Sequence, residues 1–210
     1  MLEIRQLVNQ PAASNGYVLF DRTVGDDCLL VDPGAEDSTE LLALLRQEHL
    51  QPLYIILTHE HYDHCWGVTA LRQAFPSVKV LCSTNCSEAI QDRKKNHSAF
   101  FYRPGFELSP AEILLNEIQW SFEWQGLQLR FWPAQGHTAS GIIFTLGTFV
   151  FTGDELMKDA KTVTKLKTGS PDRLLDSLQR LEGLQGQGLT VCPGHGEMFP
   201  LDGYDLSKAK

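Results

Sequence analysis

The sequence predicts an α/β protein, because two patterns along the chain indicate that fold class and the composition is that of a globular domain. Short apolar runs of strand length alternate with helical patterns along the first half of the chain, which is typical of a sheet layered with helices. The run Leu53–Leu57 is continuously apolar and bounded by Pro52 and Thr58, as expected of a strand buried on both faces. The 210 residues are 42% hydrophobic and 21% charged, an ordinary globular composition that excludes collagenous, coiled-coil and disordered chains.

A hairpin and a helix are expected before this central strand. Two apolar runs, Tyr17–Phe20 and Cys28–Val31, flank a turn-rich segment, and together they predict two paired strands. Asp37 or Ser38 can then cap a helix that continues to about residue 48, because leucines recur there at a spacing that forms one apolar face.

The elements after the central strand follow from similar patterns. A helix over residues 67–75 is expected to end before Pro76, because the residue before a proline avoids helical geometry. Later strands are expected at 78–82, 118–124, 127–132, 142–146, 149–152 and 189–192, and a helix at 171–184. Between residues 84 and 116 the pattern gives way to polar and aromatic residues, which indicates a partly helical insertion over the edge of the core. The sequence thus predicts a single domain, 1–210, with an insertion at about 84–116.

Charge and cysteine usage limit the partners and the compartment. Eighteen Lys and Arg against 26 Asp and Glu give a net charge of −8, whereas nucleic-acid binding calls for the opposite balance. The sequence shows no apolar leader and no apolar stretch of membrane-spanning length, so neither a signal peptide nor a membrane partner is expected. The five cysteines form no Cys-x-x-Cys pair, and reduced thiols of this kind favour a cytoplasmic location.

The segment from Thr58 to His64, with the sequence THEHYDH, carries the strongest functional signal. His59, His61, Asp63 and His64 follow directly on the central strand. Imidazole and carboxylate groups bind zinc and related ions, and a turn at a strand end can aim alternate side chains at one point. This spacing predicts a metal site.

Three further potential ligands lie just beyond the ends of apolar strands. His137, Asp154 and His195 occupy equivalent places in the chain, each next to a glycine that lets the backbone turn sharply. Such uniform placement favours metal binding over chance surface positions. His49 and His97 have no comparable context, and they are left unassigned.

Together these motifs resemble those of the metallo-β-lactamase-fold hydrolases, and among them the glyoxalase II-like branch. The resemblance covers nearly the whole chain. It rests on Asn15-Gly16-Tyr17, Val31-Asp32-Pro33-Gly34, the THEHYDH segment, Gly136-His137, Gly153-Asp154 and Pro193-Gly194-His195-Gly196. It implies a four-layer αβ/βα sandwich with a dinuclear metal site along one edge, whereas the strand and helix patterns alone leave several α/β topologies open.

The resemblance implies a role for each potential ligand. A first divalent ion would be bound by His59, His61 and His137, a second by Asp63, His64 and His195, and Asp154 would bridge the two. Two such ions can activate a metal-bridging hydroxide, which Asp63 would orient as the catalytic residue. Zinc is the expected metal, with iron and manganese as alternatives, because the same ligand types suit all three.

Other residues are expected to support the site or the substrate. Asp32 would either hold a ligand histidine in place, as the resemblance implies, or accept backbone hydrogen bonds in its own Asp-Pro-Gly turn. Two basic clusters, at residues 93–103 and 158–167, would attract an anionic substrate or merely solvate two loops. The expected substrate-binding residues are Lys161, Lys165, Lys167 and Tyr102.

The expected function is thioesterase-like hydrolysis of a thioester, or of a small acyl ester, on an anionic carrier such as glutathione or coenzyme A. Phe100, Phe101 and Tyr102 would form an apolar wall for this substrate. The chain departs from glyoxalase II in being shorter and in lacking the Gly-Arg pattern after Asp154, so hydroxyacylglutathione itself stays one option among thioesters. A lactone or β-lactam hydrolase of the same fold and a non-catalytic metabolite-binding or regulatory protein are the alternatives.

Overall fold

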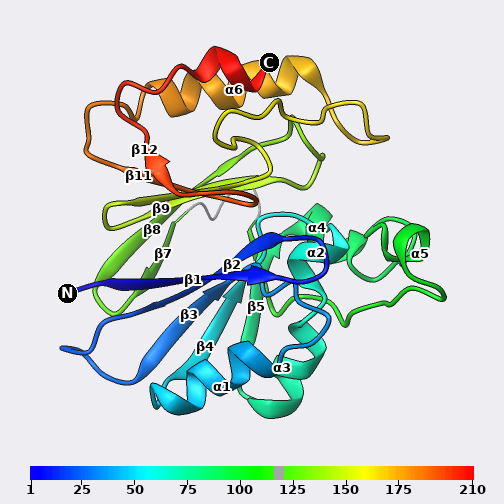
Figure 1. Cartoon of the computed structure of the whole chain (residues 1–210), viewed down its shortest axis with the longest axis vertical. Coiled ribbons are helices and arrows are strands. Elements are labelled where there is room, and N and C mark those ends of the chain that lie inside the picture. The colour runs from blue at the N-terminus through cyan, green and yellow to red at the C-terminus, as the bar shows by residue number, and fades with distance from the viewer. Residues whose placement is uncertain (116–120) are drawn as a thin grey trace. The chain divides into compact units, whose positions relative to one another are not determined.

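Figure 1 shows a computed structural model of the chain, in which residues 1–115 and 121–210 are described. The chain divides into two compact units, Met1–Leu114 and Leu115–Lys210. It contains two six-stranded sheets together with helices, which confirms the predicted α/β class. Residues 118–120 of one expected strand and residue 116 of the expected insertion lie outside the described ranges.

The first unit is built on a sheet with the strand order β1-β2-β3-β4-β5-β6. Its strands are β1 Glu3–Asn9, β2 Ser14–Phe20, β3 Asp27–Val31, β4 Gln51–Ile56, β5 Lys79–Ser83 and β6 Ile113–Leu115. The expected hairpin is the antiparallel pair β2 and β3, while β3, β4 and β5 pair in parallel. Strand β1 was not predicted, because Glu3, Arg5 and Gln6 interrupt its apolar residues.

The helices of the first unit are α1 Thr39–Gln47, α2 Tyr62–Cys65, α3 Val68–Ala74, α4 Thr84–Ala89 and α5 Ser98–Phe101. Of these, α1 and α3 lie along one face of the sheet (Figure 1). Leu45 of α1 and Leu71 of α3 are fully buried in one cluster with Leu30 and Ile55 of the sheet. Each such leucine contributes about 1.5–3 kcal/mol of hydrophobic stabilisation. This packing fixes the end of β4, from which the THEHYDH segment leaves the sheet.

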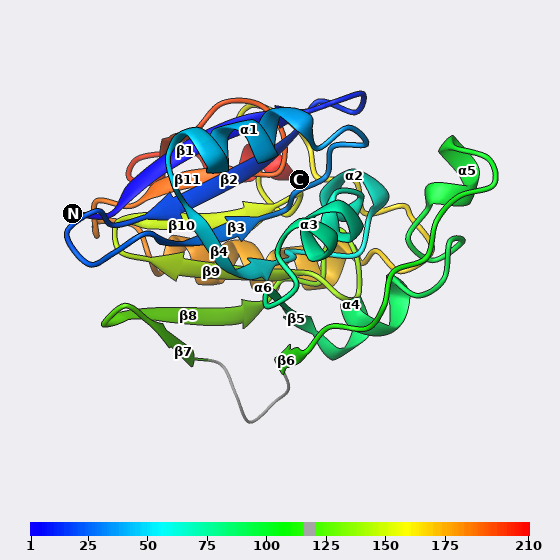
Figure 2. The ribbon, with the colours of Figure 1, turned by 90° about the horizontal axis from the view of Figure 1, so that it is seen from below.

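The expected insertion holds α4, α5 and β6. Figure 2 shows α5 at its far end, projecting away from the strands of the first unit. Phe100 and Phe101 of α5 are 72% and 63% exposed. The insertion therefore presents two aromatic rings to solvent.

The second unit is built on a sheet with the order β12-β11-β10-β9-β8-β7. Its elements are β7 Ser121–Trp124, β8 Leu127–Pro133, β9 Ile142–Leu146, β10 Phe149–Gly153, α6 Pro171–Glu182, β11 Thr190–Pro193, β12 Phe199–Pro200 and the 3-10 helix η1 Leu206–Ala209. Strands β10 and β11 pair in parallel, and the other neighbouring strands pair antiparallel. The apolar face of α6, with Leu174, Leu178 and Leu181, packs on Val150 and Val191 of the sheet. No helix in the described part of the chain has the length and hydropathy needed to cross a membrane.

Candidate metal centre

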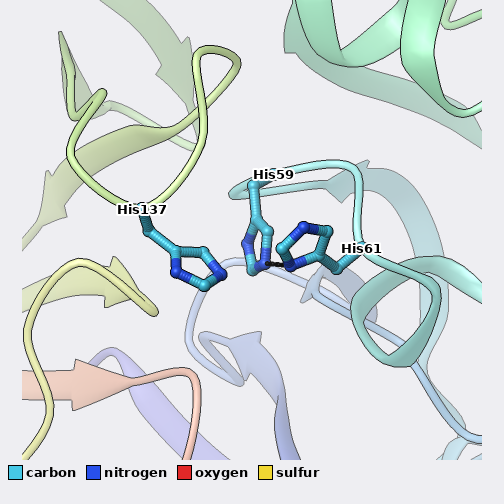
Figure 3. A group of neighbouring side chains, drawn as sticks. All are labelled: His59, His61 and His137. Atoms are coloured by element: carbon cyan, nitrogen blue, oxygen red, sulfur yellow. Dashed lines mark hydrogen bonds between the residues drawn. The ribbon is translucent and has the colours of Figure 1, made fainter. Parts of the chain in front are cut away.

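The turn after β4 and the short helix α2 together gather four of the predicted ligands, two on the turn and two on the helix. His59, His61, Asp63 and His64 are 2%, 6%, 9% and 0% exposed. The Nε2 atom of His59 lies 3.1 Å from Nδ1 of His61, and Figure 3 marks this contact with a dashed line. Nε2 of His64 lies 3.7 Å from Oδ2 of Asp63. Together with Asp32 these residues form what we call the first His/Asp cluster.

Close backbone packing holds this turn against the Asp-Pro-Gly turn that follows β3. A Cβ atom on Gly34 would lie only 1.5 Å from the carbonyl oxygen of Asp63, so no residue other than glycine fits there. The amide of Gly67 donates to the carbonyl of Pro33 at 2.8 Å, and the hydroxyl of Ser14 donates to the carbonyl of Asp63. The two turns are therefore fixed to each other by backbone contacts.

Within this cluster, Asp32 contacts Thr58 and one of the histidines through its carboxylate. Its Oδ1 accepts the backbone N–H of Thr58 at 2.7 Å, and its Oδ2 accepts the Thr58 hydroxyl at 2.6 Å. The same Oδ2 lies 3.0 Å from Nδ1 of His64, and the Thr58 hydroxyl lies 3.0 Å from Nδ1 of His59. Ligand atoms of Asp32, His59 and His64 all lie within 4.8 Å of one another. A carboxylate in this place orients imidazole ligands in metal proteins.

Three loops of the second unit gather the other predicted ligands. His137 follows β8, Asp154 follows β10 and His195 follows β11. Oδ2 of Asp154 lies 3.6 Å from Nε2 of His137 and also 3.6 Å from Nε2 of His195. We call these residues the second His/Asp cluster. Its most exposed member is His195, whose side chain is 29% exposed.

Backbone atoms orient the second cluster. Nδ1 of His137 lies 2.8 Å from the carbonyl oxygen of Val163. Because a carbonyl oxygen only accepts hydrogen bonds, Nδ1 is the donor in this contact, and Nε2 is the ring nitrogen that faces Asp154. His137 is labelled in Figure 3 on the loop after β8. The carboxylate of Glu155 accepts the backbone N–H groups of Gly136 and His137, each at 2.9 Å.

Glu155 was missed by the sequence reasoning. It is 2% exposed, and burial raises the pKa of its carboxyl group, against hydrogen bonds from Ser177 and from the His137 backbone that lower it. The available signal was an acidic residue directly after Asp154 at the end of an apolar strand. The position of Glu155 in the sequence does not show which backbone N–H groups its carboxylate accepts.

The expected substrate-binding residues lie in both units. Tyr102 packs on Trp66 with ring centroids 4.2 Å apart, and on Tyr62 at 5.4 Å. Burial, together with the nearby Asp63, raises the pKa of Tyr62 to about 12, so this phenol stays neutral. Lys161, Lys165 and Lys167 are exposed on the loop after Asp154, whereas Lys158 of the same basic cluster bonds Glu197 at 2.8 Å.

The side-chain chemistry of both clusters fits divalent metal ions. Imidazole nitrogens and carboxylate oxygens are the groups that hold zinc, iron and manganese in proteins. Cys65 and Cys192 next to the motifs are 0% and 1% exposed, and burial raises the pKa of both thiols. Their protonated state leaves the histidines and carboxylates as the metal-binding groups.

The chain matches one protein family and is similar in sequence to named proteins. The profile of the metallo-beta-lactamase superfamily matches residues 10–195. A hydroxyacylglutathione hydrolase of Yersinia pestis (strain Pestoides F) is 28% identical over 186 residues, which cover 89% of this chain and 64% of the relative. That of Hamiltonella defensa is 26% identical over 190 residues, covering 90% of this chain and 66% of the relative. This chain thus spans slightly less than two thirds of the length of these relatives.

Solved structures give the fold. The B3 metallo-beta-lactamase BLEG-1 superimposes with a TM-score of 0.86 at 28% identity, covering 95% of this chain and 94% of that protein. TTHA1623, crystallised in a di-iron-bound form, superimposes with a TM-score of 0.77 at 27% identity, covering 94% of each chain. These similarities confirm the fold that the sequence motifs implied.

Proposed function

The chain belongs to the metallo-β-lactamase superfamily, and from this membership we propose that it is a metal-dependent hydrolase of thioesters, or of small acyl esters, on an anionic carrier. The observation that carries the proposal is the pair of His/Asp clusters, in which imidazoles and carboxylates lie 3.0–3.7 Å from one another. The relatives named hydroxyacylglutathione hydrolase favour a thioester among the possible esters.

Both clusters would contribute to one dinuclear centre. One divalent ion would be held by His59, His61 and His137, the other by Asp63, His64 and His195, with Asp154 shared between them. Zinc is the first choice for this donor set, and iron or manganese is the alternative. The di-iron-bound form of TTHA1623 supports iron as the alternative metal.

When bound, the two ions would supply an activated water at neutral pH and stabilise negative charge that develops on the substrate. The chain's own residues would prepare this chemistry. Asp32 and the carbonyl of Val163 face Nδ1 of His64 and of His137, which leaves each Nε2 lone pair available for coordination. The Asp63 carboxylate would accept a hydrogen bond from the attacking water and so orient it toward the carbonyl carbon.

Charged and aromatic side chains would bind the substrate. Exposed Lys161, Lys165 and Lys167 would attract the anionic carrier, while Lys158 contributes less because it pairs with Glu197. The aromatic residues Phe100, Phe101 and Tyr102 would contact the apolar part of the substrate. We further propose that residues 1–210 act as one domain, with an insertion at about 84–116, in the cytoplasm on a small-molecule substrate.

A hydrolysis panel tests the proposal. Zinc-loaded protein would be assayed with S-lactoylglutathione, an acyl-coenzyme A, a homoserine lactone, nitrocefin and bis-p-nitrophenyl phosphate, with metal content measured on the same samples. We expect the highest kcat/KM for one of the two thioesters, and loss of that activity after chelation. Metal-loaded protein inert toward all five compounds would support the non-catalytic alternative.

β-Lactam hydrolysis is the second candidate function. It is favoured by the likeness to BLEG-1, a B3 metallo-beta-lactamase with a TM-score of 0.86 to this chain. In the same panel, turnover of nitrocefin above that of both thioesters would select it.

A further inference from the structure

The insertion contacts the first His/Asp cluster through a histidine that the sequence left unassigned. The imidazoles of His97 and His61 are stacked, with ring centroids 4.5 Å apart and planes inclined by 23°. Phe100 lies against the same His97 ring in an edge arrangement, at 5.8 Å and 80°. The His97 ring is therefore placed between a potential metal ligand and an aromatic residue of α5.

The backbone of His97 has an unusual conformation that aims its ring in this direction. Its φ of +65° and ψ of 0° are left-handed, and this conformation costs roughly 1–2 kcal/mol in a residue with a Cβ atom. Such a conformation persists only where the surrounding structure enforces it.

The preceding residue, Asn96, provides that enforcement. Its side chain is fully buried and donates to the carbonyls of Ile90 at 3.3 Å and Phe106 at 2.9 Å, while it accepts the N–H of Ser98 at 2.9 Å. Residues 90 and 106 lie on either side of this loop, so the Asn96 side chain links the two ends of the loop to each other. The His97 backbone is thus held by bonds on both sides of the loop.

Asn96 also attaches the loop to the THEHYDH segment at the start of α2. Its carbonyl oxygen accepts the backbone N–H of Tyr62 at 2.8 Å. Two consecutive residues of the insertion therefore contact two consecutive residues of this segment: Asn96 bonds the Tyr62 backbone, and His97 stacks on the His61 ring. A two-point contact of this kind restricts both the backbone and the ring of the potential ligand.

We propose that His97 is a positioning residue for His61, holding the imidazole plane so that Nδ1 faces the same point as Nε2 of His59. This inference rests on the metal-binding role proposed for His61. An oxygen atom faces the ring of His64 and that of His137. For His61, the stacked ring of His97 provides a contact across the ring face that restricts the plane of the imidazole. Loss of an outer support of a metal ligand typically lowers metal affinity about 10- to 100-fold.

Two substitutions at His97 and one control test the proposal. His97→Asn removes the ring but keeps a residue type that tolerates left-handed backbone, and His97→Phe restores a flat ring. The control is His49→Asn, because His49 is also left-handed, with φ +53°, and follows α1. Zinc affinity is measured by competition with a chromophoric chelator, and the visible spectrum of the cobalt-substituted protein reports ligand geometry.

We expect His97→Asn to bind zinc about 10- to 100-fold more weakly and to alter the cobalt spectrum, while His97→Phe and His49→Asn stay close to wild type in both readouts. Wild-type zinc affinity and spectrum in His97→Asn would overturn the proposal, as would a His97→Phe protein no better than His97→Asn. Should the wild-type chain itself bind no zinc, iron or manganese, the proposed function fails instead, before any variant is compared.

Discussion

The two His/Asp clusters differ in how their side chains are held. In the first, four potential ligands come from six consecutive residues, and side chains support them: Asp32 and Thr58 contact the rings of His64 and His59. In the second, the residues come from three separate loops, and backbone groups dominate: the Val163 carbonyl faces His137, and the amides of its loop bind Glu155.

The two clusters also contain the most buried and the most exposed of these histidines. His64 is fully buried, whereas the His195 side chain is 29% exposed. A contiguous motif packed against a sheet forms a rigid set of ligands, while a set built from separate loops depends on what holds each loop. The first cluster should therefore respond to changes in side-chain chemistry, and the second to changes in loop anchoring.

Removal of Asp154 should have the largest effect. Its Oδ2 faces two histidines at 3.6 Å each, so Asp154→Ala removes the one carboxylate of the second cluster. Loss of an outer partner of a metal ligand typically lowers metal affinity or activity about 10- to 100-fold. Loss of a residue that itself binds the metal should lower both by more. We therefore expect loss of bound metal and a fall in hydrolysis beyond about 100-fold, measured by metal analysis and kcat/KM. The matched control is Asp159→Ala, whose exposed carboxylate bonds Lys208; a wild-type metal content in Asp154→Ala would contradict the shared-ligand assignment.

Asp32→Asn should act on the first cluster. The amide keeps the size of the side chain but loses the charge and one acceptor that Thr58 and His64 share. We expect metal affinity to fall about 10- to 100-fold, measured by chelator competition. An unchanged affinity would show that Asp32 serves its own turn rather than the ligands.

Glu155→Gln should act on the second cluster through its loop. The carboxylate accepts two backbone N–H groups, and an amide in its place would turn one acceptor into a donor. Leaving a buried N–H unsatisfied costs about 1–3 kcal/mol, so urea unfolding of the metal-free protein should show a stability loss of that size. The exposed Glu182 of α6 provides the control, and equal losses in Glu155→Gln and Glu182→Gln would refute the anchoring role.

The smallest effect is expected from the basic loop. Replacing Lys161, Lys165 and Lys167 together by glutamine should raise KM for an anionic thioester about 10-fold at low salt and flatten its salt dependence. KM for a neutral ester should stay unchanged. Lys158→Gln, in which the ion pair with Glu197 is removed instead, serves as the control. Equal changes for both substrates would leave electrostatic attraction unsupported.

The difference between the two clusters also explains which residues could be predicted from the sequence. The first cluster was recognisable because its residues are contiguous and follow a buried apolar strand, and the second because each residue follows a strand and neighbours a glycine. Glu155 and His97 were not recognisable, because their roles depend on which distant backbone or ring they meet. Strand β1 was missed since polar residues interrupt it, and β12 was missed since it has only two residues.

In the function proposed for this chain, both clusters would serve one metal centre. Anomalous diffraction at the zinc edge from crystals grown with zinc tests it most directly. We expect two zinc peaks about 3.5–4 Å apart, with Asp154 contacting both and with ligands from both clusters. Zinc bound at one cluster alone, or at two sites that share no residue, would contradict it.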